Sequence, residues 1–421
     1  MMIPSIDLMN GRAVQLVGGE EKVIDAGDPR PIAEKFGRVG EIAVIDLDAA
    51  MGTGSNAELI SELLHLAPCR VGGGIRDAQT AIDWLDSGAR KVILGTAAEP
   101  GVLRELPRER VIAALDSVDG AIVDKGWTRH TGAKLEDKID ELREFVDGFL
   151  VTFVEREGRM TGLPMDRVRT IVKRAGRARV TVAGGVRAAE DVALTDQAGA
   201  DVQVGMSLYT GAMGLGEGFC APLTSDRLDG LWPSVVVDEL GNSLGLVYSS
   251  AKSVIKSLET GRGVYLSRSR NELWEKGATS GNAQELIRIE ADCDRDALRF
   301  TVRQRGGGFC HTGTRSCFGE SRGLGALERT IRDRLRNAPE DSYTERLVSD
   351  PGLLGRKLIE EAGELAEAIT PEEAGWEAAD VIYFALTAAI SKGSSLEDIE
   401  RELDRRAGKV SRRPGNAKES V

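Results

Sequence analysis

The chain has 421 residues, with 55 Lys and Arg against 67 Asp and Glu, and its formal net charge at pH 7 is −12. This balance excludes a general affinity for nucleic acid or for an anionic membrane, so any phosphate site has to be local. No run approaches eighteen apolar residues, and "MMIPSIDLMN" at the N-terminus lacks a secretory pattern. We therefore expect a cytosolic protein of two or three domains. Its five cysteines do not make a disulfide scaffold, and a close pair such as Cys310 and Cys317 more often indicates metal binding or chemistry.

The first predicted domain covers residues 1–218, where short apolar runs alternate with amphipathic stretches as in a parallel sheet covered by helices. Eight such runs are present, which is the number that closes a (β/α)8 TIM barrel. They lie at residues 2–8, 42–48, 69–74, 91–96, 111–117, 149–154, 179–185 and 201–207. The segment 71–96 recurs in similar form at 182–207, which predicts a barrel of two related halves.

The candidate site of this barrel lies at the C-terminal ends of its strands, where such folds carry their active sites. Asp7 and Asp116 end strands 1 and 5 on opposite sides, and two opposed carboxyls can serve as acid and base. Glycine-rich turns in each half would present backbone N–H groups to two phosphates. The residues of these turns are Gly73, Gly74, Gly95, Thr96, Gly184, Gly185 and Gly205.

The barrel resembles the phosphoribosylformimino-5-aminoimidazole carboxamide ribotide isomerases of histidine synthesis. The resemblance rests on "IPSIDLMNGRAVQL", "VIDLDAAMGTGSN", "VGGGIR", "LGTAA", "KGW" and the phosphate turns of the second half. It implies that Asp7 and Asp116 are the acid–base pair and that Thr152 is a supporting polar group.

Three features of the barrel depart from the isomerase pattern. Gln15 stands where an Arg is usual, Phe153 and Glu157 replace small or polar residues and an Asp, and the loop after strand 1 is predicted to be short. In the fungal multifunctional proteins the corresponding region is degenerate. Two hypotheses follow, an isomerase and a non-catalytic scaffold for the domains downstream.

A break in the pattern follows the barrel, because "GAMGLGEGFCAPLTSD" (211–226) is rich in glycine. The next predicted domain, 227–320, is a β-rich α+β domain: "SVVVDELGNSLGLVYSS" predicts a hairpin turning at Gly241-Asn242, and "ELIRIEADCDRDALRFTVRQ" two more strands. In an extended strand Asp292, Asp294 and Asp296 would share one face, and clustered carboxylates suit Mg²⁺.

Three cysteines of the same domain, Cys293, Cys310 and Cys317, are arranged like the ligands of a catalytic Zn²⁺ with one open position. His311 could transfer protons, and Arg315 could hold an anion. The alternative is a set of structural cysteines beside a solvated acidic turn.

"GLVYSS", "GVYLSRSRNELWEKGATSGN", "DCDRDAL" and "FCHTGTRSCFG" resemble the phosphoribosyl-AMP cyclohydrolases, above all the form found in fungal multifunctional proteins. The resemblance implies zinc on the cysteines, magnesium on the aspartates, and a homodimer that shares its zinc site. Ala278 replaces the acidic residue that is usual in the family. The substrate contacts that the resemblance implies are Arg268, Arg270, Lys276, Ser280 and Arg315.

The last predicted domain, 323–421, is all-α, and acidic residues recur on its helices at spacings of three and four. Carboxylates of two antiparallel helices that face one another can bind Mg²⁺, which in turn binds a polyphosphate. A solvated acidic helix is the alternative, although the second helix is otherwise apolar. The candidate magnesium ligands are Glu360, Glu361, Glu364, Glu377 and Asp380.

This domain resembles the phosphoribosyl-ATP pyrophosphatases through EExxE followed by ExxD, together with "APEDSYTERL" and "KVSRRPGNAK". The resemblance implies cleavage between the α and β phosphates, which yields the substrate of the cyclohydrolase step. We therefore predict a multifunctional enzyme acting on phosphoribosyl nucleotides. The runner-up is a single active cyclohydrolase flanked by inactive domains.

Overall fold

The structure is a computed structural model that describes residues 1–19, 21–124, 127, 129–337 and 342–411. Parts of "KGW", "APEDSYTERL" and "KVSRRPGNAK" lie outside these residues. The chain forms two compact units. The first consists of Met1–Val236, Leu246–Gly306 and the segment from Gly408 onward, and the second of Val237–Gly245 and Gly307–Ala407.

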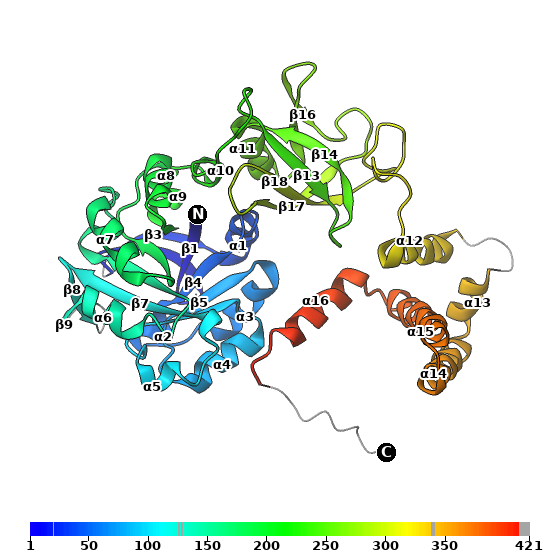
Figure 1. Ribbon diagram of the computed structural model, residues 1–421, viewed down its shortest axis with the longest axis horizontal. Helices are drawn as coiled ribbons and strands as arrows, with labels where there is room; N and C mark the ends of the chain where they lie inside the picture. Colours follow the sequence, from blue (N-terminus) through cyan, green and yellow to red (C-terminus); the bar gives the residue numbers. More distant parts are fainter. Residues whose placement is uncertain (20, 125–126, 128, 338–341, 412–421) are drawn as a thin grey trace. The chain divides into compact units, whose positions relative to one another are not determined.

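Eight parallel strands close into a barrel in the first unit, which confirms the predicted fold (Figure 1). The barrel closes where Met2, Ile3 and Pro4 of the first strand pair with Val202, Gln203 and Val204 of the last. In barrel order the strands are β1 (Met2–Met9), β4 (Ile42–Asp46), β5 (Cys69–Gly72), β6 (Lys91–Leu94), β7 (Val111–Val118), β10 (Gly148–Phe153), β11 (Arg179–Ala183) and β12 (Asp201–Val204).

Helices follow the barrel strands, and capping residues stabilise their ends. In α4, Asp77 accepts a hydrogen bond from the Thr80 backbone N–H at 2.7 Å, and Gly88 ends the helix in the left-handed conformation. The helices of this region are α1 (Pro29–Gly37), α2 (Leu47–Met51), α3 (Ala57–Leu66), α4 (Ala78–Ser87), α5 (Pro100–Leu103), α6 (Leu135–Leu142), α7 (Met165–Ala175), α8 (Ala189–Gln197), α9 (Met206–Tyr209) and α10 (Leu215–Cys220).

Two antiparallel hairpins extend the barrel at related positions. Strands β2 (Arg12–Val17) and β3 (Glu21–Gly27) follow the first barrel strand, and β8 (Ala121–Asp124) and β9 (Arg129–Lys134) follow the fifth. The prediction of a short loop after strand 1 was therefore wrong, because β2 and β3 lie between β1 and α1, and Arg12, Ala13 and Val14 pair back onto β1. Each half of the barrel thus adds a hairpin to the end that carries the candidate site.

The glycine-rich segment after the barrel forms helix α10 instead of a simple linker. A Cβ on Gly216 would lie 2.8 Å from the Cα of Ile255 in α11 (Ala251–Thr260), so glycine permits this close helix contact. A sheet of order β14-β13-β18-β17 follows, which confirms the predicted hairpin and the two further strands. Its strands are β13 (Trp232–Val237), β14 (Ser243–Ser249), β17 (Gln284–Ala291) and β18 (Leu298–Gln304), beside the pair β15 (Val264–Ser267) and β16 (Glu272–Glu275).

Five helices form most of the second unit, as predicted. One core cluster joins Ile331, Leu386, Ile390 and Leu396, and another joins Leu347, Leu354 and Phe384. The helices are α12 (Gly323–Arg336), α13 (Tyr343–Ser349), α14 (Pro351–Glu367), α15 (Pro371–Ser391) and α16 (Leu396–Ala407). Within the described residues, none of the helices combines the length and apolar character that a membrane span requires.

Candidate functional sites

A cavity of about 1070 Å³ opens among the barrel loops and gathers all the site residues predicted for this region. Asp7 of β1, Asp116 of β7 and Thr152 of β10 line it together with Glu157. We call Asp7, Asp116 and Glu157 the barrel carboxyls. The glycine-rich turns line the same cavity through Gly73, Gly74, Gly95, Thr96, Gly184, Gly185 and Gly205.

Glycine is required in these turns because other backbone approaches closely. Gly73 has a φ of +93°, and a Cβ there would lie 2.2 Å from the carbonyl oxygen of Asp46. The equivalent Gly184 has a φ of +91°, and its Cβ would lie 2.5 Å from the carbonyl oxygen of Phe153. The two halves therefore build their turns in the same way, which matches the internal repeat.

Asp7 is held by two neighbouring side chains. The Ser5 hydroxyl donates to Asp7 Oδ1 at 3.2 Å, and the Gln15 amide donates to Asp7 Oδ2 at 3.4 Å. Burial raises the pKa of Asp7 to about 6, against a smaller lowering by the Ser5 hydrogen bond. A carboxyl with this pKa can both lose and take up a proton near neutral pH.

Asp116 lies across the cavity with its own partners. Burial raises its pKa, and hydrogen bonds from the side chains of Trp127 and Thr152 lower it. Sequence reasoning had named Thr152 but not Trp127, although the motif "KGW" contains it. Trp127 belongs to the loop between β8 and β9, so the contact forms only when this hairpin folds back.

Glu157 is a third carboxyl, which sequence reasoning had noted only as a departure from the isomerase pattern. Burial and then the charges of Asp7 and Asp116 raise its pKa to about 8, so it carries a proton at neutral pH. Phe153, the other substitution in this segment, is the last residue of β10 and is fully buried. The barrel thus combines three acidic side chains with two backbone turns that suit phosphate.

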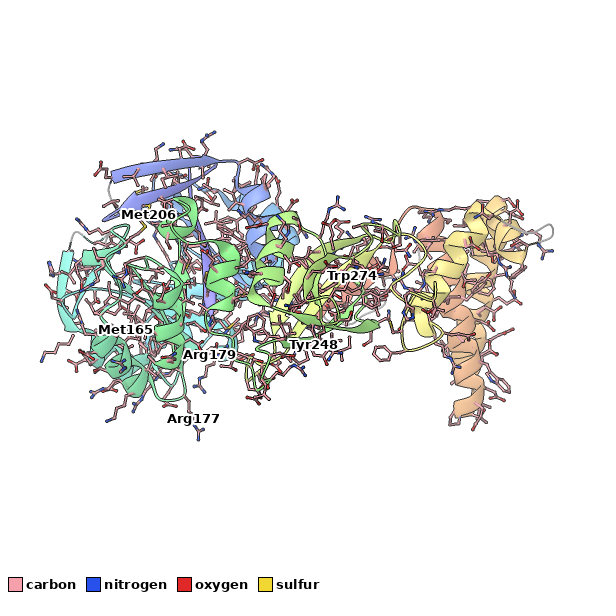
Figure 2. The ribbon with its side chains drawn as sticks, turned by 90° about the horizontal axis from the view of Figure 1, so that it is seen from above. Met165, Arg177, Arg179, Met206, Tyr248 and Trp274 are labelled. Carbon is pink, nitrogen blue, oxygen red and sulfur yellow. The ribbon has the colours of Figure 1, made fainter. Side chains whose placement is uncertain are left out.

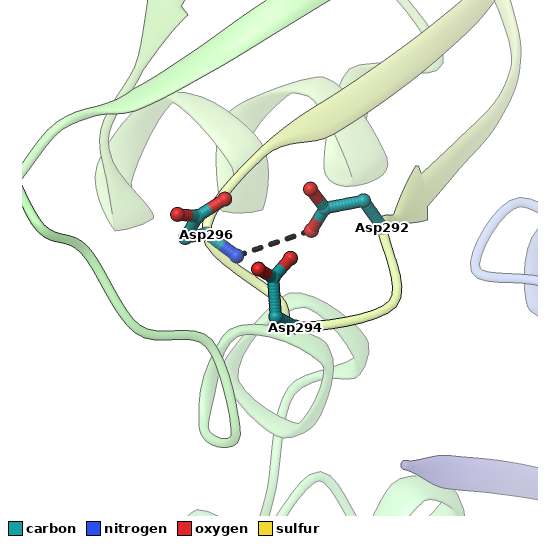
Figure 3. Close-up of side chains that lie close together, drawn as sticks. All are labelled: Asp292, Asp294 and Asp296. Atoms are coloured by element: carbon teal, nitrogen blue, oxygen red, sulfur yellow. Dashed lines mark hydrogen bonds between the residues drawn. The ribbon is translucent and has the colours of Figure 1, made fainter.

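The three aspartates of the middle region converge, but not in the way that the sequence predicted. Carboxylate oxygens of Asp292, Asp294 and Asp296 lie within 4.8 Å of one another (Figure 3). The extended-strand prediction was wrong, because β17 ends at Ala291 and the aspartates occupy the hairpin loop before β18. We call these three residues the loop carboxylates.

Hydrogen bonds within the loop hold this turn. Asp292 Oδ1 accepts from the backbone N–H of Asp296 at 3.1 Å (Figure 3). It also accepts from the backbone N–H of Ala297 at 3.2 Å. The charge of Asp294 is the largest cause of a raised pKa at Asp296, followed by burial and by the charges of Asp292 and Asp226. Such mutual repulsion is relieved by a divalent cation, so the donor set fits Mg²⁺. Asp226 is a neighbour that sequence reasoning missed.

The cysteines predicted to hold zinc are divided between the two units. Cys293 lies in the first unit, in the exposed acidic loop, and Cys310 and Cys317 lie in the second. Hydrogen bonds from Thr312 are the main cause that lowers the pKa of Cys310 to about 6, and Cys317 contributes to the same shift. A thiol with this pKa is largely a thiolate at neutral pH, the form that binds metal. The three-cysteine set stays a prediction.

Two other predicted residues lie beside these cysteines in the second unit. His311 is exposed, with Nδ1 3.8 Å from Cys310 Sγ. Arg315 donates to the buried carboxylate of Asp238 at 2.9 Å, so one N–H group of its guanidinium is already hydrogen-bonded within the protein.

The substrate contacts predicted for the first unit lie on or near β15 and β16. The guanidinium of Arg268 lies 3.9 Å from the ring centroid of Tyr248, and Lys276 Nζ lies 5.5 Å from that of Trp274 (both rings labelled in Figure 2). Arg270 forms an ion pair with Glu272. Ser280 accepts from the Asn282 backbone N–H at 3.4 Å.

The helical region brings together part of its predicted acidic set. Glu361 of α14 and Glu377 and Asp380 of α15 have carboxylate oxygens within 4.8 Å of one another, and we call them the helix carboxylates. Burial and the charge of Glu364 are the main causes that raise the pKa of Glu377, and Glu364 also forms a hydrogen bond with it. Four of the five predicted residues therefore meet between two helices, as a cation site requires.

The fifth, Glu360, instead pairs with Lys357 at 3.0 Å. Lys357 also pairs with Glu361, at 2.7 Å. Sequence reasoning missed this lysine, although its spacing of three and four residues from the two glutamates predicts the contacts.

The fold and these sites define a multidomain protein in which a (β/α)8 barrel is joined to two further regions that carry carboxylate clusters. Family models match each region: "Histidine biosynthesis protein" at residues 1–214, "Phosphoribosyl-AMP cyclohydrolase" at 245–319 and "Phosphoribosyl-ATP pyrophosphohydrolase" at 324–407. The first match spans half of the chain, and the chain belongs to the histidine biosynthesis protein family.

Individual relatives agree with these matches. The chain is 57% identical over 194 residues to a histidine biosynthesis bifunctional protein of Schizosaccharomyces pombe, covering 46% of each. It is 54% identical over 195 residues to a trifunctional protein of Saccharomyces cerevisiae, covering 46% of this chain and 24% of that protein. It is 36% identical over 224 residues to a phosphoribosyl imidazole-4-carboxamide isomerase of Gemmatimonas aurantiaca, covering 50% of this chain and 94% of the isomerase. The chain thus spans less than half the length of these two fungal relatives.

Proposed function

We propose that the chain hydrolyses phosphoribosyl-ATP to phosphoribosyl-AMP and pyrophosphate, and then opens the adenine ring of phosphoribosyl-AMP. One observation carries the proposal: a cluster of three converging carboxylates lies within each of the two regions that the hydrolase families match. The product of the pyrophosphatase step is the substrate of the cyclohydrolase step, so the two assignments support each other.

In the cyclohydrolase region the loop carboxylates would hold Mg²⁺, and Cys293, Cys310 and Cys317 would hold Zn²⁺. Bound Zn²⁺ would lower the pKa of water and so supply hydroxide at neutral pH. The lowered pKa of Cys310 supports thiolate ligation. His311 is the candidate for proton transfer, and Arg268, Arg270, Lys276, Ser280 and Arg315 are candidates for contact with the phosphorylated substrate.

In the pyrophosphatase region the helix carboxylates, with Glu360 and Glu364, would hold Mg²⁺ against the polyphosphate. Magnesium would neutralise phosphate charge and orient the group that water attacks. The convergence of Glu361 on α14 with Glu377 and Asp380 on α15 supports this proposal, because solvated acidic residues need not converge across two helices.

A homodimer with a shared zinc site is part of the proposal. The two helices that carry the helix carboxylates also expose large apolar side chains, since Ile359 is 75% exposed and Trp376 is 69% exposed. An exposed apolar surface of this kind suits contact with a second copy. We further propose domains at 1–218, 227–320 and 323–421, in a cytosolic protein that needs neither nucleic acid nor membrane.

A second function is proposed for the barrel, namely isomerisation of a bis-phosphorylated aminoaldose to an aminoketose. The observation that favours it is the single cavity lined by Asp7, Asp116 and the phosphate turns of both halves. The two aspartates would act as acid and base, with Glu157 as a protonated neighbour. A non-catalytic scaffold is the alternative, because Gln15 lacks the charged fork that Arg would offer to an anionic substrate.

Two reciprocal variants test the hydrolase proposal in the purified chain. Asp294→Asn should stop ring opening of phosphoribosyl-AMP and leave pyrophosphate release from phosphoribosyl-ATP intact, because it removes only a loop carboxylate. Glu361→Gln should stop pyrophosphate release and leave ring opening intact. If either variant lost both activities or neither, the assignment of one reaction to each carboxylate trio would be wrong.

A further inference from the structure

The loop that carries the loop carboxylates is tied to the chain segment that leaves the barrel. Thr224 donates its backbone N–H to the carbonyl oxygen of Arg295 at 3.0 Å, and its hydroxyl to the carbonyl oxygen of Asp294 at 3.4 Å. The Trp232 indole N–H in turn donates to the carbonyl oxygen of Thr224. The backbone of the loop is therefore held by residues outside its own hairpin.

Arg295 lies between the aspartates in the sequence and has a φ of +67°. A non-glycine residue in this left-handed region is uncommon and needs support from its surroundings. The support is an ion pair between the Arg295 guanidinium and Asp196, in the last turn of barrel helix α8. Both groups belong to the first compact unit.

Asp196 stands at a position where its helix does not favour it. An acidic side chain near a helix C-terminus opposes the helix dipole, so it needs cationic partners. The Asp196 side chain is only 9% exposed and pairs with Arg295, and it also accepts a hydrogen bond from the main-chain nitrogen of Met1 at 3.0 Å. Asp201 accepts from the same Met1 nitrogen at 2.6 Å, which provides a matched control.

The ion pair also determines where the positive charge of the loop lies. A guanidinium amid three carboxylates would neutralise them and compete with a cation. By pairing with Asp196, Arg295 leaves the loop carboxylates facing one another, with carboxylate oxygens within 4.8 Å.

We propose that Asp196 of the barrel is a positioning residue for the divalent-cation site of the cyclohydrolase region, acting through Arg295. The barrel would then contribute to ring opening whether or not it is itself an isomerase. This inference rests on the proposed cation site of the loop carboxylates.

The test measures Mn²⁺ binding to the full-length chain, with the electron paramagnetic resonance signal of free Mn²⁺ as readout. The class of sites that disappears in Asp294→Asn is assigned to the loop. Asp196→Asn should weaken this class about tenfold, because residues in direct contact couple by roughly this amount. Asp201→Asn should leave it unchanged, and Asp196→Glu, which keeps the charge, should retain most of the affinity.

Arg295→Asn provides a second test that does not alter the barrel, since Asn tolerates the left-handed backbone. It should also weaken Mn²⁺ binding, and the Asp196→Asn, Arg295→Asn double variant should be no weaker than Asp196→Asn alone. Wild-type affinity in both single variants, or additive losses in the double variant, would overturn the positioning role. If Asp294→Asn removed no Mn²⁺ class from the wild-type pattern, the proposed cation site would be wrong, and the positioning role with it.

Discussion

The barrel and the loop before β18 both gather three acidic side chains, but in opposite surroundings. The barrel carboxyls line a cavity, and burial is the largest cause of their raised pKa values. The loop carboxylates are exposed or half-buried, and the charge of Asp294 is the largest cause of the raised pKa of Asp296.

The difference separates two kinds of chemistry for one type of residue. A carboxyl whose pKa is raised by burial holds a proton near neutral pH and can transfer it. Carboxylates that repel one another at the surface are stabilised by a cation instead. The helix carboxylates share features of both, because burial is the largest cause of the raised pKa of Glu377, followed by the charge of Glu364, while Lys357 pairs with Glu361.

The largest expected effect concerns the zinc ligands. Cys317→Ala should release zinc and lower ring opening by about 10⁴-fold or more, because water is then no longer acidified at neutral pH. Pyrophosphate release should persist. Elemental analysis and assays of both steps measure these effects, with Cys220→Ala as control because Cys220 lies in α10, where burial raises its pKa to about 12. Retention of both zinc and ring opening would show that the ligand assignment is wrong.

The proposed proton transfer in the barrel depends on Asp116. Asp116→Asn should lower isomerisation by roughly 10²–10⁴-fold, since it removes one of two groups that exchange protons with the substrate. The measurement is steady-state turnover of the bis-phosphorylated aminoaldose, with exposed Asp137→Asn in α6 as control. A wild-type chain that binds this substrate without converting it would favour the scaffold.

A smaller loss is expected in the helical region. Glu364→Gln should slow pyrophosphate release by about 10²-fold, because a carboxylate beside Glu377 no longer helps to hold magnesium. Phosphoribosyl-AMP supplied directly should still be opened. Glu372→Gln, in the exposed first turn of α15, serves as control. Unchanged turnover of phosphoribosyl-ATP in Glu364→Gln would remove this residue from the site.

The smallest effect is on stability and comes from Glu157. Its pKa is about 8 in the folded chain, against 4.5 as the ordinary value, so the folded state binds more protons between these pH values. The contribution of protonated Glu157 to the free energy of unfolding is fully present below about pH 4.5 and is lost as the pH rises through about 8. Glu157→Gln removes this dependence and should be more stable than wild type at pH 9, by about 1–3 kcal/mol.

Equilibrium urea unfolding at pH 5 and pH 9 measures this difference. The free energy of unfolding of Glu157→Gln should exceed that of the wild type only at pH 9. An equal difference in the free energy of unfolding at both pH values would mean that Glu157 does not titrate between them. Glu157 would then not belong to the carboxyls whose pKa is raised by burial.

Regular periodicity made most of the fold predictable. Eight apolar runs at βα spacing specified the barrel, and the internal repeat predicted that Gly73 and Gly184 occupy equivalent turns. Strand alternation misled at Asp292, Asp294 and Asp296, because it carries no information on side chains that bond to backbone within a turn.

Residues distant in sequence were the other limit. Trp127 reaches Asp116 only through a folded hairpin, and Asp196 meets Arg295 only because α8 packs beside the loop. Neither contact leaves a local pattern. Lys357 is different, since its spacing from Glu360 and Glu361 would have revealed the pairing.

Metal removal tests the contrast most directly. The purified chain, treated with a chelator and then assayed for all three reactions, should lose pyrophosphate release and ring opening, and Mg²⁺ with Zn²⁺ should restore both. Isomerisation by the barrel carboxyls should not change, because it needs only protons. Hydrolytic steps that survive metal removal, or isomerisation that is lost with the metals, would contradict the division between the proton-transferring barrel carboxyls and the cation-binding loop and helix carboxylates.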